Sequence, residues 1–278
     1  MTATAPRVSA NSCVTNIALS DRHGRPLALA LHDPRRAPRA AVVVMPGAQA
    51  TAERYAWLGE GLAAAGCRVA VAEAPEVHRT TPFSPDHPQP TRLITIDHLV
   101  RTLAYIGPAA ATAVPVIAVG HSLGGTVILE ALDADEARRN PQADFADASV
   151  PVDGLAGAVI LGASLQPDVM GMVVRHRSAT APLTKPAHTA LLFLSGECDA
   201  MIPPAAMAAT ARRYGAARHE VMAGANHLGW MAGRGPFDRP DLDGKATIPP
   251  ERQRSLTITR IVAFLDEVAV RPSRRQQP

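Results

Sequence analysis

Cysteine, long apolar segments and targeting patterns are what this sequence has least of. The three cysteines, Cys13, Cys67 and Cys198, are an odd and sparse set, which excludes a disulfide framework and favours the reducing cytoplasm. No apolar run approaches the ~18 residues that a membrane-spanning helix needs, and residues 1–10 lack the basic and then hydrophobic pattern of a secretory signal. We therefore expect a cytoplasmic protein without a membrane partner.

Strong charge and cofactor motifs are also missing. The formal net charge is only +3, and arginines occur in pairs such as Arg35-Arg36 and Arg138-Arg139 instead of a stripe, so we expect no nucleic-acid partner. The sequence has no His-Glu-x-x-His, paired Cys-x-x-Cys or Gly-x-x-x-x-Gly-Lys motif, and we expect neither a metal nor an organic cofactor. No pattern indicates the oligomeric state.

What the chain does contain is a succession of short apolar runs. Of its 278 residues 47% are hydrophobic and 19% are charged, as in an ordinary globular domain. The runs do not alternate with polar residues, which is typical of strands covered on both faces of a parallel sheet. They span residues 41–45, 69–71, 114–119, 158–161 and 190–194.

Segments with helical spacing lie between these runs. Thr51 is a candidate N-cap for a helix that carries Tyr55, Leu58 and Leu62 on one face, and Gly66 is placed to end that helix. Two further apolar stripes have the same spacing, one made by Ile94, His98, Leu99 and Leu103 and the other by Ile258, Ile261, Leu265 and Val268.

The alternation of strands and helices predicts an α/β fold with a doubly wound, mostly parallel eight-stranded sheet. Residues 14–20 and 27–31 are joined by a short connection, which predicts an antiparallel strand at the N-terminal edge. We expect one domain over residues 1–270 without a large cap, and a flexible tail over 271–278. Residues 76–91 contain four prolines and resist assignment, and the polar residues 133–152 predict a surface excursion.

The sequence Gly120-His121-Ser122-Leu123-Gly124 stands between an apolar run and a helical segment. A Gly-x-Ser-x-Gly pentapeptide alone recurs by chance. Between a strand and a helix, however, it is typical of a strained turn that lifts a serine hydroxyl out of the carboxyl edge of the sheet. The flanking glycines let two stretches of backbone approach without Cβ clashes. Ser122 is therefore the candidate nucleophile.

A serine hydroxyl is a poor nucleophile unless a base takes its proton and a third group orients that base. Both groups are expected in loops at the carboxyl ends of later strands. Asp199 follows the run 190–194, and His227 follows a strand expected over 219–222, which gives the chain order Ser122, Asp199, His227. Glu197 is the competing carboxylate, while the other nine histidines have no comparable setting.

Two main-chain amides are also needed to stabilise an oxyanion. One is expected from Leu123, directly after the nucleophile. The other is expected from Ala48, in the loop after the run 41–45, where Gly47 permits a sharp turn. The substrate pocket is expected to draw on Gln49, His121, Leu165 and Trp230.

These segments together resemble the α/β-hydrolase superfamily over about residues 14–268. The run from Gly120 to Gly125 looks like the nucleophile elbow of its lipases and esterases. The sequence Met45-Pro46-Gly47-Ala48 is similar to the oxyanion loop of the uncapped group of chlorophyllases, dienelactone-hydrolase-like proteins and bacterial cutinases. The resemblance implies Ser122 as nucleophile, Asp199 as acid, His227 as base, and Ala48 and Leu123 as oxyanion donors.

The chain departs from two members of that group. Dienelactone hydrolases proper use a cysteine where this chain has Ser122, and polyester hydrolases typically carry an aromatic residue where it has Ala48. We therefore expect a serine carboxylesterase that acts on small-molecule esters with small to medium apolar acyl groups. Two alternatives use other chemistry on the same scaffold: an acyltransferase or thioesterase of a biosynthetic pathway, and a ligand-binding protein without turnover.

Overall fold

Nine strands form one sheet in the computed structural model, which describes residues 7–8, 12–81, 84–109, 114–139, 155–165, 189–215 and 217–270. Their order across the sheet is β1-β2-β3-β5-β4-β8-β9-β10-β11. The pairs from β1 to β5 are antiparallel, and all pairs from β5 to β11 are parallel. The strands are β1 (Arg7–Val8), β2 (Ser12–Ser20), β3 (Pro26–Pro34), β4 (Ala40–Met45), β5 (Cys67–Glu73), β8 (Val116–His121), β9 (Leu155–Leu161), β10 (Ala190–Gly196) and β11 (Arg218–Met222).

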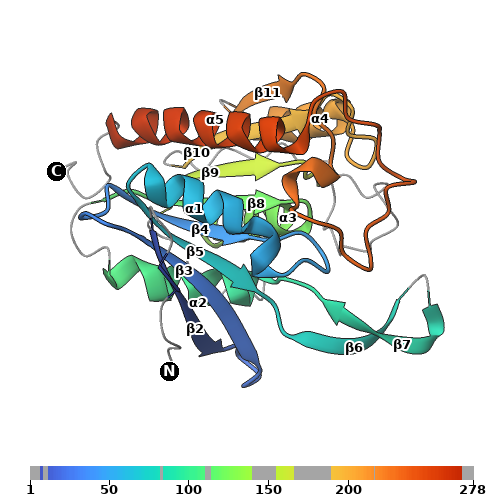
Figure 1. Ribbon diagram of the computed structural model, residues 1–278, viewed down its shortest axis with the longest axis horizontal. Coiled ribbons are helices and arrows are strands. Elements are labelled where there is room, and N and C mark those ends of the chain that lie inside the picture. Colours follow the sequence, from blue (N-terminus) through green and yellow to red (C-terminus); the bar gives the residue numbers. More distant parts are fainter. Residues whose placement is uncertain are drawn as a thin grey trace.

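The expected fold class is confirmed. Each predicted apolar run lies in a strand, except that residues 114–115 of one run precede β8, and β2 and β3 form the antiparallel hairpin at the N-terminal side (Figure 1). The two-residue strand β1 adds a ninth strand at that edge, which was not predicted. Because β4, β8, β9, β10 and β11 run parallel, their carboxyl ends meet at one edge of the sheet.

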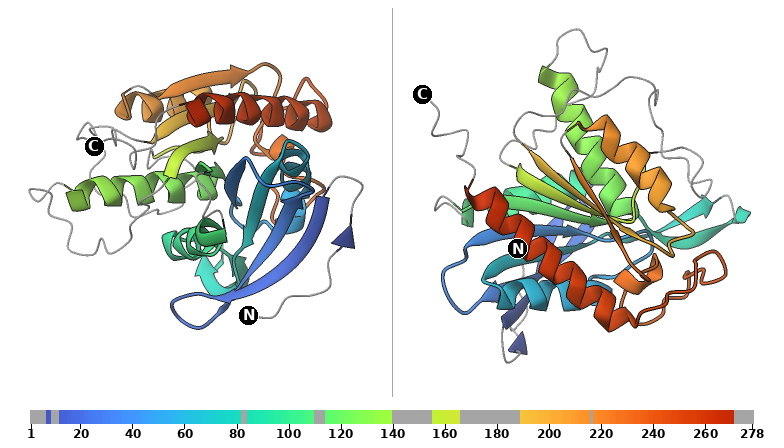
Figure 2. Two further views of the ribbon diagram at one scale, coloured as in Figure 1. Left: turned by 90° about the vertical axis from the view of Figure 1, so that its left-hand side faces the viewer. Right: turned by 90° about the horizontal axis from the view of Figure 1, so that it is seen from above.

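Helices cover both faces of the sheet (Figure 2). The helices α2 (Ile96–Ala109), α3 (Leu123–Arg139) and α4 (Pro204–Arg213) pack into the apolar core on one face, which includes Leu99, Leu129 and Met207. The helices α1 (Ala56–Ala64) and α5 (Pro250–Val270) pack into the core on the other face, which includes Leu58 and Phe264. The sheet thus separates two cores, as a doubly wound fold requires.

Two helices differ from the sequence-based expectation. The helix α4 was not predicted, and α3 continues to Arg139, so that residues 133–139 are helical instead of part of a surface excursion. Residues 140–152 of that expected excursion and the expected tail 271–278 lie outside the described residues. Among the described helices, none is both long enough and apolar enough to cross a membrane.

The segment after Thr51 is helical, but its start differs from the prediction. It begins with the 3-10 turn η1 (Ala52–Tyr55), and the Thr51 side chain makes no capping hydrogen bond. The N–H of Ala52 instead donates to a carboxylate oxygen of Glu73, at 2.8 Å, at the end of β5. A distant carboxylate therefore replaces the local cap. Tyr55, Leu58 and Leu62 are fully buried as expected, and Gly66 follows the helix with a φ of 87°.

The proline-rich segment forms a two-stranded arm that projects from the body of the protein (Figure 1). Among the described strands, β6 (Glu76–Thr81) and β7 (Ser84–Arg92) pair only with each other. Proline is compatible with such a strand because the edge away from the partner needs no N–H donor. The hairpin was not predicted, because the prolines of this segment argue against strands in the sequence.

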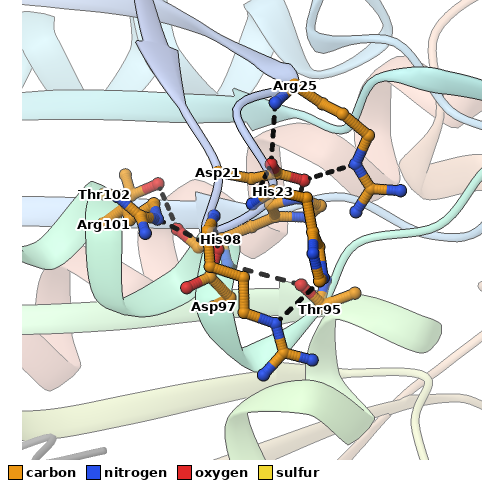
Figure 3. A network of polar contacts seen from close by, with 9 residues as sticks. Asp21, His23, Arg25, Thr95, Asp97, His98, Arg101 and Thr102 are labelled. Carbon is orange, nitrogen blue, oxygen red and sulfur yellow. Dashed lines mark hydrogen bonds and ion pairs between the residues drawn. The ribbon is translucent and has the colours of Figure 1, made fainter.

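A polar network fastens the turn between β2 and β3 to the start of α2 (Figure 3). The Asp21 carboxylate is buried and accepts hydrogen bonds from the main-chain N–H and the Nε of Arg25, at 2.8 and 2.6 Å. The Nδ1 of His98 accepts from the N–H of Thr95 at 3.2 Å, so its Nε2 carries the proton, 3.8 Å from Asp21. The network therefore holds a neutral histidine inside the protein.

Buried histidines make the stability of the protein depend on pH. Burial lowers the pKa of His32, His98 and His121. The unfolded chain binds protons at these rings near pH 6.5, where the folded protein does not, so each ring contributes a loss of stability as the pH falls below about 6.5. Glu130 and Asp133 act in the opposite direction, because burial raises their pKa to about 7 and about 6.

His32 offers a direct test of this linkage. Both of its ring nitrogens are buried without a hydrogen-bond partner among the described residues. We expect His32→Leu to be at least as stable as the wild type at pH 7.5, because no hydrogen bond is lost. Between pH 7.5 and 5.5 its free energy of unfolding should change relative to that of the wild type by about 1 kcal/mol in favour of the variant. Urea unfolding at the two pH values measures the free energy of unfolding of each protein. If the wild type and His32→Leu show the same pH dependence, the lowered pKa of His32 is contradicted.

Candidate active site

Ser122 occupies a strained turn between β8 and α3. It follows the last residue of β8, precedes the first residue of α3, and has a φ of 50°, which L-residues rarely adopt. The neighbouring glycines are sterically required. A Cβ on Gly124 would overlap the main-chain oxygen of Met45, and one on Gly120 would lie 2.5 Å from the N of Gly125. The segment thus has the elbow geometry that its sequence predicts.

Asp199 and His227 meet at the carboxyl edge of the sheet. Asp199 follows β10 and His227 follows β11, and each residue is only 2% exposed. The Nδ1 of His227 lies 2.9 Å from Oδ2 of Asp199, and the other carboxylate oxygen accepts the N–H of Ile202 at 2.6 Å. A carboxylate at Nδ1 keeps the proton there and leaves Nε2 with a free lone pair. This is the tautomer that a general base needs.

Glu197, the competing carboxylate, has a different partner. Its side chain is exposed and accepts the N–H of Gly224 at 2.8 Å. It caps the turn after β11, and it makes no hydrogen bond with His227 among the described residues.

The residues at the end of β9 contact both Ser122 and the pair of Asp199 and His227. The N–H of Ser122 donates to the carbonyl of Leu161 at 2.9 Å. The next residue, Gly162, is so close to the pair that a Cβ on it would lie 3.0 Å from Oδ2 of Asp199 and 3.1 Å from Nδ1 of His227. The hydrogen bonds of the described residues do not include one between Ser122 and His227. Such bonds often form only when substrate is bound.

The loop after β4 abuts the nucleophile. A Cβ on Gly47 would lie 3.4 Å from the Cβ of Ser122. The N–H groups of Gly47, Gln49 and Ala50 all donate to protein oxygens, whereas that of Ala48 has no acceptor in the part of the chain that the structure describes. Leu123 begins α3, so its N–H has no partner inside the helix. The amide of Ala48 thus has no acceptor among the described residues, and that of Leu123 has none inside its helix, so neither observation conflicts with the predicted oxyanion donors.

Comparison with known proteins adds to this geometry. No family model and no curated protein matches the sequence. Brefeldin A esterase, a bacterial homologue of human hormone-sensitive lipase, has a TM-score of 0.61 at 13% identity, over 93% of this chain and 78% of its own. Esterase 2 of Thermogutta terrifontis phosphoramylated by tabun has a TM-score of 0.59 at 15% identity, and the match covers 90% of this chain and 94% of the esterase. Est1E from Butyrivibrio proteoclasticus has a TM-score of 0.53 at 14% identity, and the match covers 92% of this chain and 99% of Est1E.

The chain has the α/β-hydrolase fold. At these identities the likeness establishes the fold and leaves the activity to the geometry of the site. In this fold the nucleophile, acid and base follow one another as serine, aspartate or glutamate, and histidine, which is the order that the sequence predicts for Ser122, Asp199 and His227.

A buried tyrosine supports both the elbow and the loop. The hydroxyl of Tyr55 accepts the N–H of Gly47 at 2.9 Å and lies 2.6 Å from Nδ1 of His121. Burial raises the pKa of Tyr55, and burial together with nearby His227 lowers that of His121. Both groups are therefore uncharged, and a hydrogen bond joins the hydroxyl of Tyr55 to the ring of His121. The sequence predicted Tyr55 only as an apolar helix residue, and nothing in its spacing indicated this polar role.

The predicted pocket residues lie deeper than expected. His121 is buried, and its ring centroid lies 4.7 Å from that of His227. Trp230 is fully buried and donates from Nε1 to Thr257 of α5 at 3.0 Å. Leu165 is buried in the core that α2, α3 and α4 cover. Only Gln49 keeps partial exposure, and its side chain bonds to Arg92.

Asp243 is a site residue that the sequence did not reveal. Its carboxylate accepts the N–H of His227 at 3.2 Å and that of Leu228 at 2.8 Å. Burial raises the pKa of Asp243, although these two N–H groups favour its charged form. It holds the backbone of the histidine loop, while Asp199 holds the ring. Asp243 lies in an irregular segment without a motif, so no sequence signal marked it.

Proposed function

We propose that the protein is a serine hydrolase that cleaves carboxylic esters with small to medium apolar acyl groups. The observation that carries the proposal is the buried hydrogen bond between His227 and Asp199, next to a serine in a left-handed turn. The esterases that share the fold support the same reaction class. A small-molecule ester as partner is part of this proposal, and the cytoplasmic location stays a prediction from the cysteine content.

The first half of the reaction acylates the serine. His227 takes the proton of the Ser122 hydroxyl on Nε2, and Oγ attacks the ester carbonyl. The negative charge that develops on the carbonyl oxygen is stabilised by the N–H groups of Ala48 and Leu123. As the tetrahedral intermediate collapses, the imidazolium returns its proton to the departing alcohol. Asp199 stabilises the charged ring throughout.

The second half releases the acid. His227 takes a proton from a water molecule, whose oxygen attacks the acyl-enzyme. The same two amides stabilise the second tetrahedral intermediate, and the proton then passes to Ser122 Oγ as the acid leaves. The preference for apolar acyl groups is supported by Leu123 and Met201, two half-buried side chains that pack against the same core as Leu165.

A fluorophosphonate probe tests this function without knowledge of the natural ester. We expect the probe to phosphonylate Ser122 with one group per chain, because its phosphoryl oxygen mimics the oxyanion. Peptide mass spectrometry locates the label. Removal of the base in His227→Ala should slow the labelling by about 100-fold or more. A folded protein that stays unlabelled at Ser122, or that is labelled elsewhere, would contradict the proposal.

A further inference from the structure

Two non-glycine residues have a left-handed backbone in the part of the chain that the structure describes: Ser122, with a φ of 50°, and Gln49, with a φ of 62°. Such a conformation costs free energy in an L-residue and persists only where its surroundings fix it, which occurs most often at functional sites. The turn between β8 and α3 accounts for Ser122. Gln49 directly follows Ala48 in the neighbouring loop, and its conformation calls for a separate explanation.

A reciprocal pair of hydrogen bonds fixes Gln49. Its N–H donates to the carbonyl of Arg92 at 2.8 Å, and the N–H of Arg92 donates to Oε1 of Gln49 at 2.7 Å. The side chain of Gln49 thus closes a ring with the main chain of the last residue of β7. Because its acceptor oxygen is directed to Arg92, that oxygen is occupied by the protein.

Arg92 is in turn fixed by ion pairs at the base of the arm. Its guanidinium lies 3.2 Å from Glu73 and 3.2 Å from Glu76. The other oxygen of Glu73 accepts the N–H of Ala52 at 2.8 Å. Both ends of the segment from Gln49 to Ala52 are therefore tied to residues at the ends of β5 and β7. The loop has little freedom to relax the strained turn.

The anchored residues bracket the free amide of Ala48. Before it, the N–H of Gly47 is held by the hydroxyl of Tyr55, and after it, the N–H of Gln49 is held by Arg92. The amides on both sides of that of Ala48 are thus fixed by hydrogen bonds, and the left-handed residue Gln49 directly follows Ala48. An oxyanion donor is effective only when its direction is fixed before the charge develops.

We propose that Gln49 is a positioning residue of the oxyanion loop, whose side chain holds the left-handed turn that directs the Ala48 N–H at the reacting carbonyl oxygen. The inference rests on the proposed hydrolase function. It assigns to Gln49 a role different from the pocket lining that its sequence position predicted. A residue that contacts substrate changes KM when it is altered, whereas one that orients an oxyanion donor changes kcat.

The test compares Gln49→Met, which keeps the side-chain length without the acceptor, with Gln49→Asn, which favours the turn but is one methylene short. We expect each to lower kcat for p-nitrophenyl butyrate by about 10- to 100-fold, with KM within about twofold of the wild type. The affinity for a trifluoromethyl ketone should fall in parallel, because that inhibitor forms an oxyanion on Ser122. If one variant fails to fold, the other carries the test.

Arg92→Met is the matched control, because it removes the guanidinium and leaves the main-chain groups that Gln49 uses. Its loss of kcat should be smaller than that of Gln49→Met. The inference is overturned if both folded Gln49 variants keep the wild-type kcat, if they raise KM alone, or if Arg92→Met loses more. Phosphonylation of Ser122 distinguishes failure of this inference from failure of the proposed function. If Ser122 is labelled but the Gln49 variants keep the wild-type kcat, only the role of Gln49 is refuted. If Ser122 is not labelled, the hydrolase function is refuted.

Discussion

Substitution of Ser122 by alanine is expected to lower the rate of ester hydrolysis by roughly three to six orders of magnitude. Alanine has no hydroxyl to attack the carbonyl, so the acyl-enzyme cannot form, and only the oxyanion donors and substrate binding remain to accelerate direct attack by water. The fold should persist, because the strained turn is held by the N–H of Ser122 and not by its side chain. Hydrolysis of p-nitrophenyl butyrate, with circular dichroism to monitor folding, measures the effect.

The protein contains a matched control for this substitution. Ser195, in β10, is fully buried, and its hydroxyl lies 2.6 Å from Nε2 of His219. This contact between a serine and a histidine involves neither Ser122 nor His227. Ser195→Ala should cost about 1 kcal/mol of stability through the lost hydrogen bond and leave kcat within about threefold. A folded Ser122→Ala protein with more than a tenth of the wild-type activity would refute the proposed nucleophile.

Substitution of Asp199 by asparagine is expected to lower kcat by about two to four orders of magnitude. The amide loses the charge that stabilises the imidazolium, and when its NH2 group faces Nδ1 it favours the tautomer whose Nε2 cannot accept a proton. Its volume is nearly unchanged, so packing around the buried ring should be preserved. Steady-state kinetics with a nitrophenyl ester measure the loss.

Glu197→Gln is the comparison that makes this result specific. The two carboxylates are two residues apart, but Glu197 is exposed and caps the N–H of Gly224, a bond that the glutamine carbonyl can also accept. We expect kcat within about threefold of the wild type. An equal loss in both variants would mean that net charge at this edge matters, and not the hydrogen bond between Asp199 and His227.

The parts of the site that the sequence made predictable are local or follow chain order. The glycines of the pentapeptide around Ser122 are required by local sterics, since only glycine fits beside Met45 and Gly125, and so the motif could be recognised from the sequence. Apolar runs predict buried strands because a strand covered on both faces excludes polar residues. Once the strands are placed, the parallel topology brings the loops with Asp199 and His227 to the same edge. The order of the chain therefore determined these candidates.

Other features depend on contacts between residues far apart in the chain. The choice between Asp199 and Glu197 depended on side-chain direction, which strand patterns leave open for the residues that follow the end of a strand. The two strands of the proline-rich arm tolerate their prolines because, among the described strands, each has one edge without a partner, where no N–H donor is needed. That edge depends on which strands pair in the folded protein, and the prolines themselves do not reveal it.

The sequence by itself determined the α/β fold and the order of the proposed nucleophile, acid and base, because short-range patterns of burial and backbone freedom encode both. Only the tertiary structure decided what holds them in place. The support of Gly47 by Tyr55, of the histidine loop by Asp243, and of Gln49 by Arg92 joins residues 8, 16 and 43 positions apart. Hydrogen bonds over such separations leave no periodic trace in a sequence, because each needs only one polar side chain at a place that folding defines.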